Sequence, residues 1–311
     1  MKLAFVYAGQ GSQKVGMGQD FYQAHPTFQK VLDSAPVDFD LKKLCLEGPE
    51  EQLGQTRYTQ PCLVAFAIGV TNLLAERGVR PDAVAGLSLG EYSALYAAGV
   101  LDGDTALKMV AFRGRAMEDA AAGQDCGMTA VLSLDEEKLQ QACDGAAELG
   151  VVQICNYNCP GQLVIGGTRV AVDRAGELAK ELGAKRCMPL KVSGPFHTKL
   201  MKGAGDALAD YFKDCSFGQM QVPVYFNCKG GPMDGEDTIP ALLERQVQSP
   251  VYWQNTILAM QAAGIDTILE IGPGKALTSF VKKTAPGIVT YNIDTAADLE
   301  SVVAALKGEG L

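Results

Sequence analysis

Histidine is scarce in this 311-residue chain, which contains only His25 and His197. Its nine cysteines include no C-x-x-C pair. Neither a Cys/His metal site nor a disulfide framework is therefore predicted. We expect the cysteines to be small buried side chains in a reducing compartment and the protein to hold no metal.

Positive charge is also in deficit, because the net charge is −9. A nucleic-acid surface would need a local basic patch working against this overall field, so we expect no nucleic-acid partner. The first apolar run ends at Gly9, and no later run reaches the roughly 18 apolar residues of a membrane-spanning helix. These absences predict a cytoplasmic protein without a membrane partner.

The glycine patterns of nucleotide-binding loops are incomplete. In AGQGSQKVGMG (8–18), Lys14 occupies the position of the third glycine of a G-x-G-x-x-G motif. The segment GPGK (272–275) lacks the spacing of a P-loop. We therefore expect neither NAD nor ATP, and no other cofactor.

What the chain does contain is an alternation of apolar, strand-like runs with amphipathic, helix-like segments. This alternation predicts an α/β fold with a parallel, helix-covered sheet. The strand-like runs are LAFVYA (3–8), AVAGL (83–87), VPVYFN (222–227) and DTILEIG (266–272).

Residues 124–189 have a different pattern, with four strand-like runs and two helix-like segments in the order βαββαβ. This order is typical of a ferredoxin-like α+β unit. We therefore predict a large α/β subdomain at 1–123 and 190–311 and an inserted ferredoxin-like subdomain at 124–189. The four runs are TAVLSL (129–134), VVQICNYN (151–158), QLVIGG (162–167) and RCMPL (186–190).

The segment GLSLG (86–90) places one serine between two glycines, after a strand-like run and before a helix-like segment. A sharp strand-to-helix turn would lift the hydroxyl of Ser88 above the sheet edge, and Gly86 and Gly90 would let neighbouring backbone pass closely. Such a serine is a candidate nucleophile. The alternative is a glycine-rich turn in which the serine is incidental.

A serine needs a base, and the chain offers two histidines. His25 precedes a proline at a predicted helix boundary, whereas His197 follows a strand-like run and a Gly-Pro turn, which favours His197 as the base. The alternative is a structural histidine. The acidic residues between Ser88 and His197 lie mostly in helices or in the inserted unit, so a main-chain carbonyl is a candidate to orient the imidazole.

Helical spacing places Arg113 on an apolar stripe with Met109 and Met117, whereas Arg115 shares the opposite side with Asp119 as a solvated pair. A guanidinium directed inward needs an anionic partner. A substrate carboxylate is one candidate for that partner. The alternatives are an internal acid or a side chain that extends to solvent.

Taken together, these segments resemble the malonyl-CoA:acyl-carrier-protein transacylases of type II fatty-acid synthesis and their polyketide acyltransferase relatives. The resemblance implies an α/β fold in which a hydrolase-like parallel sheet core carries the inserted ferredoxin-like subdomain. The segments that carry it, in order, are GQGSQ (9–13), TQP (59–61), GLSLGEYSAL (86–95), MVAFRG (109–114), NYNCPGQLVIGG (156–167), GPFHTKLM (194–201), ERQVQSPVYW (244–253) and EIGPGK (270–275).

The resemblance also implies catalytic roles. Ser88 matches the acylated nucleophile of the family, and His197 matches the general base. The main-chain N–H groups of Gln10 and Leu89 match the oxyanion hole.

Four further residues match the family's substrate-binding positions. Arg113 matches the residue that binds the malonyl carboxylate, and Gln246 the glutamine whose main-chain carbonyl orients the histidine. Gln60 lies in the TQP motif, and Phe196 resembles the malonyl-preferring form of its motif.

Two positions depart from the family pattern. Leu87 stands where the family usually has histidine before the nucleophile, so any contact of that imidazole with the acyl or thioester group is absent or replaced. Ala8 stands where proline is common.

The resemblance predicts a serine acyltransferase that moves a malonyl group from malonyl-CoA to the phosphopantetheine thiol of an acyl carrier protein, in fatty-acid biosynthesis. We expect a monomer that meets its carrier transiently. The alternatives are a serine esterase or thioesterase, a non-catalytic carrier-binding module, and an acyltransferase serving a polyketide synthase. Five basic residues near His197 form a candidate carrier-docking rim: Lys185, Arg186, Lys191, Lys199 and Lys202.

Overall fold

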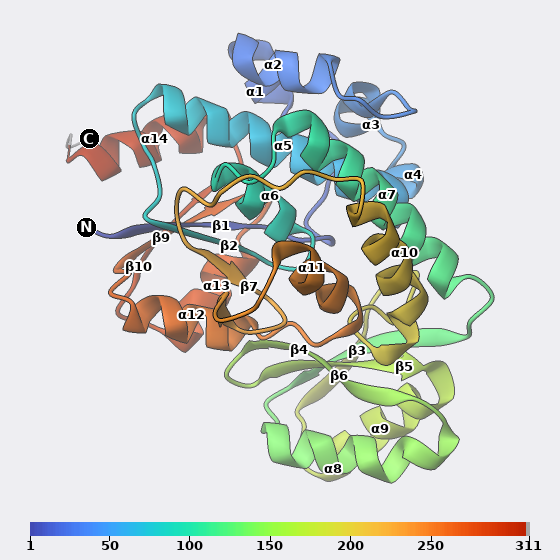
Figure 1. Cartoon of the computed structure of the whole chain (residues 1–311). Helices are drawn as coiled ribbons and strands as arrows, with labels where there is room; N and C mark the ends of the chain where they lie inside the picture. The colour runs from blue at the N-terminus through green and yellow to red at the C-terminus, as the bar shows by residue number, and fades with distance from the viewer. Residues whose placement is uncertain (309–311) are drawn as a thin grey trace.

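A computed structural model describes residues 1–308 of the chain. Its larger sheet has six strands in the order β10-β9-β1-β2-β7-β8, all parallel except β8, which pairs with β7 in the antiparallel sense (Figure 1). The strands are β1 (Leu3–Tyr7), β2 (Ala83–Gly86), β7 (Val224–Phe226), β8 (Gly231–Pro232), β9 (Thr267–Ile271) and β10 (Val289–Ile293).

The central strand β1 shows why the sheet is covered on both faces. Leu3, Phe5 and Tyr7 belong to one hydrophobic core and Ala4 and Val6 to another, because successive side chains of a strand point to opposite faces. The first core includes residues of α5 (Thr56–Glu76), α6 (Gly90–Ala97), α7 (Gly103–Ala121), α10 (Lys202–Phe212), α11 (Ile239–Gln248) and α14 (Ala296–Lys307). The second includes residues of α12 (Trp253–Ala262) and α13 (Ala276–Thr284).

Short helices precede α5 and cover it. Residues from all four of them pack into the first core (Figure 1). The short elements are α1 (Gln19–Ala24), α2 (Pro26–Asp33), α3 (Leu41–Glu47) and α4 (Glu50–Leu53), with two 3-10 turns elsewhere at Ala147–Leu149 and Lys199–Met201.

Helix α5 is long and apolar on average, although it contains no uninterrupted run of roughly 18 apolar residues. It has 21 residues and, by length and composition, is the one helix among residues 1–308 that is apolar enough to cross a membrane. It lies inside the fold, where 78% of its apolar window is buried. A helix enclosed by other helices needs no polar face, which explains its composition.

The second sheet is antiparallel, with strand order β4-β5-β3-β6, and α8 and α9 pack on one face of it. Its elements follow in the predicted order βαββαβ: β3 (Cys126–Leu132), α8 (Glu136–Ala146), β4 (Val152–Cys159), β5 (Gln162–Thr168), α9 (Arg169–Glu181) and β6 (Arg186–Pro189). The predicted fold class, a parallel-sheet α/β core with a separate α+β unit, is confirmed. Because this sheet has its own core, we propose 124–189 as the inserted subdomain.

The sequence did not predict two strands, β8 and β10. β8 has only two residues, one of which is a proline. β10 lies at the sheet edge and buries only Ile293 fully, so its sequence lacks the apolar run of an inner strand.

Candidate active site

The turn that carries Ser88 joins β2 to α6 and is strained. Ser88 has φ 52°, a left-handed conformation that residues other than glycine adopt rarely. A Cβ on Gly86 would lie 1.9 Å from the carbonyl carbon of Gly90, and one on Gly90 would lie 2.2 Å from the carbonyl oxygen of Tyr7. The two glycines of the motif therefore make room for backbone on either side of the serine.

This packing predicts a large stability loss for Gly86→Ala. The added methyl group would collide with main-chain atoms that have no space to move, so we expect the free energy of unfolding to fall by about 3 kcal/mol. Gly103→Ala is the matched control, because its Cβ would meet no atom closer than 3.9 Å. Urea unfolding of both variants measures the difference, and an equal stability of the two would contradict this account of the turn.

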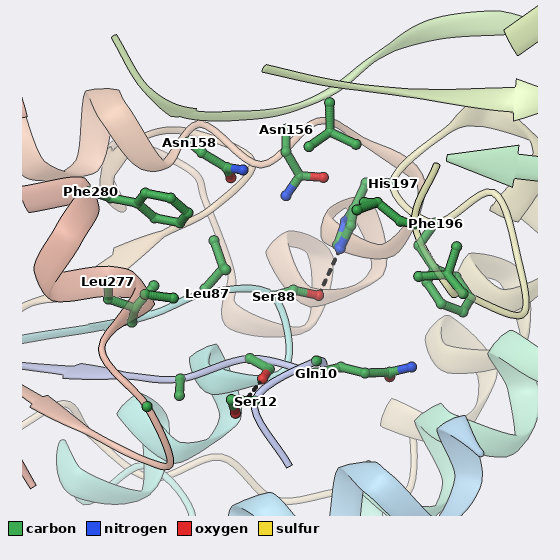
Figure 2. Close-up of a pocket in the computed structure, with 18 of the residues that line it drawn as sticks. Gln10, Ser12, Leu87, Ser88, Asn156, Asn158, Phe196, His197, Leu277 and Phe280 are labelled. Atoms are coloured by element: carbon green, nitrogen blue, oxygen red, sulfur yellow. Dashed lines mark hydrogen bonds between the residues drawn. The ribbon is translucent and has the colours of Figure 1, made fainter. Parts of the chain in front are cut away.

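Ser88 and His197, which lie 109 residues apart in sequence, meet at this turn. The Oγ of Ser88 lies 2.7 Å from the Nε2 of His197 (Figure 2). The Nδ1 of His197 lies 2.9 Å from the main-chain oxygen of Gln246. That carbonyl fixes the tautomer with the proton on Nδ1, so Nε2 is the acceptor facing Ser88. The other histidine, His25, lies at the junction of α1 and α2 and does not line the cavity.

The imidazole of His197 is almost completely buried, with 3% of its surface exposed. Burial, and then the nearby charge of Arg113, lower its pKa from 6.5 to about 4. Both causes disfavour the charged form. His197 is therefore neutral at physiological pH and able to accept a proton.

Arg113 is fully buried, as its place on the apolar stripe predicts. Its Nη2 donates to Ser88 Oγ at 3.2 Å and to Gln246 Oε1 at 2.9 Å, and its guanidinium lies 5.5 Å from the ring centre of Tyr92. Within residues 1–308 its Nε and Nη1 have no hydrogen-bond partner and it makes no ion pair. Burial lowers the pKa of this guanidinium. It neither extends to solvent nor pairs with an internal acid.

Arg115, two residues later, corrects a smaller expectation. It pairs with Asp38 at 2.9 Å and not with Asp119. The partner comes from the loop before α3, which helical spacing alone does not reveal.

Gln10 and Leu89 flank the serine from two segments. Gln10 follows β1 and lines the cavity, and Leu89 directly follows Ser88 and is buried. Neither main-chain N–H makes a hydrogen bond to another residue in the part of the chain that the structure describes. Both donors are available to a ligand oxygen.

Gln60 and Gln246 lie behind the cavity and do not line it. The side chain of Gln60 is fully buried and its Nε2 lies 3.5 Å from Gln10 Oε1. Gln246 Nε2 donates to the main-chain oxygen of Ser88 at 2.9 Å. These two glutamines therefore do not line the cavity themselves, and each contacts a residue that does, Gln10 or Ser88.

The cavity at this site has a volume of about 490 Å³ and separates the parallel sheet from β4 and β5 (Figure 2). Ser88, Arg113 and His197 all line it, and Phe196 and Leu87 contribute apolar wall. Leu87 therefore places an alkyl group where the family usually has an imidazole. Other lining residues are Met117, Met128, Asn156, Asn158, Leu277 and Phe280.

Two buried polar residues beside the serine were not assigned to the site from sequence. Asn227 Oδ1 accepts the main-chain N–H of Ser88 at 2.6 Å, and Glu91 Oε2 accepts the main-chain N–H of Asn227 at 2.6 Å. Burial raises the pKa of Glu91 to about 8. Glu91 is thus an internal acceptor and not an exposed carboxylate at a helix start. The one sequence feature that could have pointed to Asn227 is its position at the end of the strand-like run VPVYFN (222–227).

The described residues contain neither a disulfide bond nor a cluster of metal-binding side chains. All nine cysteines lie within residues 1–308 as free thiols, and seven are buried. In the same range, no three His, Cys, Asp or Glu side chains cluster as metal ligands.

The fold and the site define a class, the α/β enzymes that act on acyl groups through a serine on a strained strand-to-helix turn. Residues 4–303 match the family described as the acyl transferase domain. The chain belongs to this family, and within it to the malonyl CoA-acyl carrier protein transacylases.

Relatives of this name are similar over nearly the whole chain. The malonyl CoA-acyl carrier protein transacylase of Bacillus subtilis is 41% identical over 99% of this chain and 98% of its own length. That of Escherichia coli K12 is 40% identical over 91% of this chain and 92% of its own length.

Solved structures of transacylases are also similar to this chain over nearly its whole length. The transacylase structure from Streptococcus pneumoniae is 47% identical, with a TM-score of 0.93, and covers 98% of this chain and 100% of its own. A malonyl-transacylase solved in complex with a type II polyketide synthase acyl-carrier protein is 37% identical, with a TM-score of 0.95, over 98% and 100% of the two chains.

Proposed function

We propose that this protein transfers a malonyl group from malonyl-CoA to the phosphopantetheine thiol of an acyl carrier protein, through a malonyl ester on Ser88, in fatty-acid biosynthesis. The observation that carries the proposal is the pair of contacts made by one atom, Ser88 Oγ. Ser88 Oγ lies within hydrogen-bond distance of a neutral, buried base, His197, and of a buried cation, Arg113. A base activates the hydroxyl, and a cation without an acidic partner selects an acyl group that carries a carboxylate.

In the first half-reaction, Ser88 Oγ attacks the thioester carbonyl of malonyl-CoA while His197 Nε2 takes its proton. The main-chain N–H groups of Gln10 and Leu89 stabilise the oxyanion of the tetrahedral intermediate. The carbon–sulfur bond then breaks, and His197 gives its proton to the departing CoA sulfur.

The second half-reaction runs the same steps in reverse with a new thiol. His197 takes the proton of the phosphopantetheine thiol, whose sulfur attacks the malonyl carbonyl. The bond to Ser88 Oγ breaks, and His197 returns the proton to the serine. No redox step or metal is needed, so we propose that the enzyme uses no cofactor.

The distal carboxylate of the malonyl group would lie against Arg113. The guanidinium is held by Gln246 and stacked near Tyr92, so it is positioned before substrate arrives. Its Nη2, 3.2 Å from Ser88 Oγ, places a charged donor beside the position of the acyl group. An acetyl group has no carboxylate and therefore cannot make this contact with Arg113.

This role predicts a change of specificity for Arg113→Ala. We expect kcat/KM for malonyl-CoA to fall about 100-fold, because a hydrogen bond to a charged group contributes roughly 1.5–3 kcal/mol, whereas kcat/KM for acetyl-CoA should not fall. Arg115→Ala removes an arginine of the same helix that pairs with Asp38 at the surface, so it should leave both values unchanged. A variant Arg113→Ala that still prefers malonyl over acetyl would remove this assignment.

The carrier is expected to approach over β6 and the loop before His197. Lys185, Arg186 and Lys191 are exposed there, suited to an acidic partner, whereas Lys202 is already paired with Asp206. We further propose a cytoplasmic monomer that meets its carrier transiently and binds neither nucleic acid nor membrane.

Incubation with radiolabelled malonyl-CoA, with and without a phosphopantetheinylated carrier protein, tests the proposed reaction. We expect label on the carrier and little free malonate. Release of malonate at the rate of transfer would show a thioesterase instead.

A further inference from the structure

The main chain of Ser88 is held from both sides by side-chain amides. Its N–H donates to Asn227 Oδ1 at 2.6 Å, and its carbonyl accepts from Gln246 Nε2 at 2.9 Å. A left-handed serine is sparsely populated in peptides and persists only where its surroundings fix it. These two amides are the side-chain contacts that fix it here.

Asn227 makes a second contact with the same turn. Its Nδ2 donates to the main-chain oxygen of Gly86 at 2.7 Å, so one planar amide spans the peptide groups on either side of Leu87. The sheet explains this placement. β7 runs parallel to β2 with Ala85 beside Tyr225, so Asn227 comes level with the turn as the two strands end.

Asn227 is itself held by Glu91. The Glu91 side chain, in the first turn of α6, accepts the main-chain N–H of Asn227 through Oε2 at 2.6 Å. Asn227 and Glu91 have no exposed surface, so water does not compete for these contacts. The end of β2, Ser88, the start of α6 and the end of β7 are thereby joined in one closed hydrogen-bonded ring.

We propose that Asn227 is a positioning residue for acyl transfer, which holds the serine turn in its left-handed form through paired hydrogen bonds to Ser88 and Gly86. Asn227 does not line the cavity and touches no reacting atom. Its Oδ1 accepts the hydrogen bond of the Ser88 N–H. By fixing the turn, this contact holds Ser88 Oγ 2.7 Å from His197 Nε2 and also fixes the position of the Leu89 N–H. This inference rests on the proposed function, since it requires acylation at Ser88.

The first test is Asn227→Ala. We expect kcat for malonyl transfer to fall about 10- to 100-fold, because misplacement of a nucleophile by a fraction of an ångström slows the chemical step. KM for malonyl-CoA should stay within about twofold, because Arg113 and the cavity wall are intact. Asn72→Ala is the matched control. Its Oδ1 accepts a hydrogen bond from Tyr96 at 2.5 Å, away from the site, and its kcat should equal that of the wild type.

The second test, Asn227→Asp, remains informative if the alanine variant does not fold. A protonated aspartic acid can accept from Ser88 and donate to Gly86 as the amide does, whereas the carboxylate cannot donate and would repel the oxygen of Gly86. We therefore expect kcat, relative to wild type at the same pH, to rise at least about tenfold as the pH falls from about 8 to about 5.5. The titratable and charged groups around this position are Glu91, Arg113, Cys228, Arg245 and His197.

Those groups are present in wild type and variant alike, so the ratio of the two rates reports chiefly on residue 227. A rising ratio supports the positioning role, which mere loss of packing would not produce. A ratio that stays flat with pH, or wild-type kcat in Asn227→Ala, would overturn it. If wild type itself is not acylated by malonyl-CoA at Ser88, the proposed function fails, and that outcome is distinct from failure of this inference.

Discussion

Replacement of His197 by alanine is expected to lower kcat for malonyl transfer about 10⁴-fold at neutral pH. Without the imidazole, nothing within reach accepts the proton of Ser88 or protonates the departing sulfur. His25→Ala is the natural control, because it removes the other histidine of the chain from the junction of α1 and α2. Steady-state transfer to a carrier protein measures both variants. Comparable losses in the two would contradict the assignment of the base.

The pH profile gives a second result for the same residue. With its pKa lowered to about 4, His197 stays neutral and active well below pH 6.5 and becomes protonated, and inactive, only as the pH falls toward 4. The wild-type plot of kcat/KM should therefore be flat at mildly acidic pH and fall near pH 4. A fall centred at the ordinary histidine value of about 6.5 would show that the imidazole is not desolvated in the free enzyme.

Replacement of Ser88 by alanine is expected to have an equally large effect, a loss of kcat of about 10⁴-fold or more. The alanine variant cannot form the ester, so both half-reactions are lost together. Ser93→Ala, which removes a buried hydroxyl from α6, the helix that follows the Ser88 turn, should transfer malonyl groups at nearly the wild-type rate.

The double variant adds a stricter condition. A nucleophile and its base act as one unit, so Ser88→Ala with His197→Ala should be no slower than Ser88→Ala alone. Losses that multiply in the double variant would mean that the two residues act independently, which their 2.7 Å contact does not allow.

Much of the site follows from the sequence because single segments encode it. The spacing of Gly86 and Gly90 around a serine specifies a turn that only glycine permits at those positions. The apolar stripe of α7 identifies Arg113 as buried, because helical periodicity decides which face is inside. With only two histidines in the chain, local context was enough to separate His197 from His25.

The residues behind the site could not be predicted in the same way. Asn227 acts on Ser88 only because β7 pairs with β2, and Glu91 joins them only because α6 packs beneath the turn. Such contacts depend on tertiary packing of segments distant in sequence, which no local pattern carries. The burial of Glu91 is a clear example, since a carboxylate in the first turn of a helix is usually solvated.

The same reasoning explains the elements that the sequence did not reveal. β10 is an edge strand with mixed exposure, so it lacks a clear period. Helix α5 is apolar on nearly all sides because other helices enclose it, and composition alone cannot distinguish this from a membrane span.

The central claim is that a malonyl group becomes attached to Ser88. The intact mass of the protein after mixing with malonyl-CoA, followed by mapping of the modified peptide, tests it most directly. We predict the addition of one malonyl group to the wild type, located on the peptide that contains Ser88, and no addition to Ser88→Ala. An adduct that persists in Ser88→Ala, or transfer by a wild type that never carries the adduct, would contradict it.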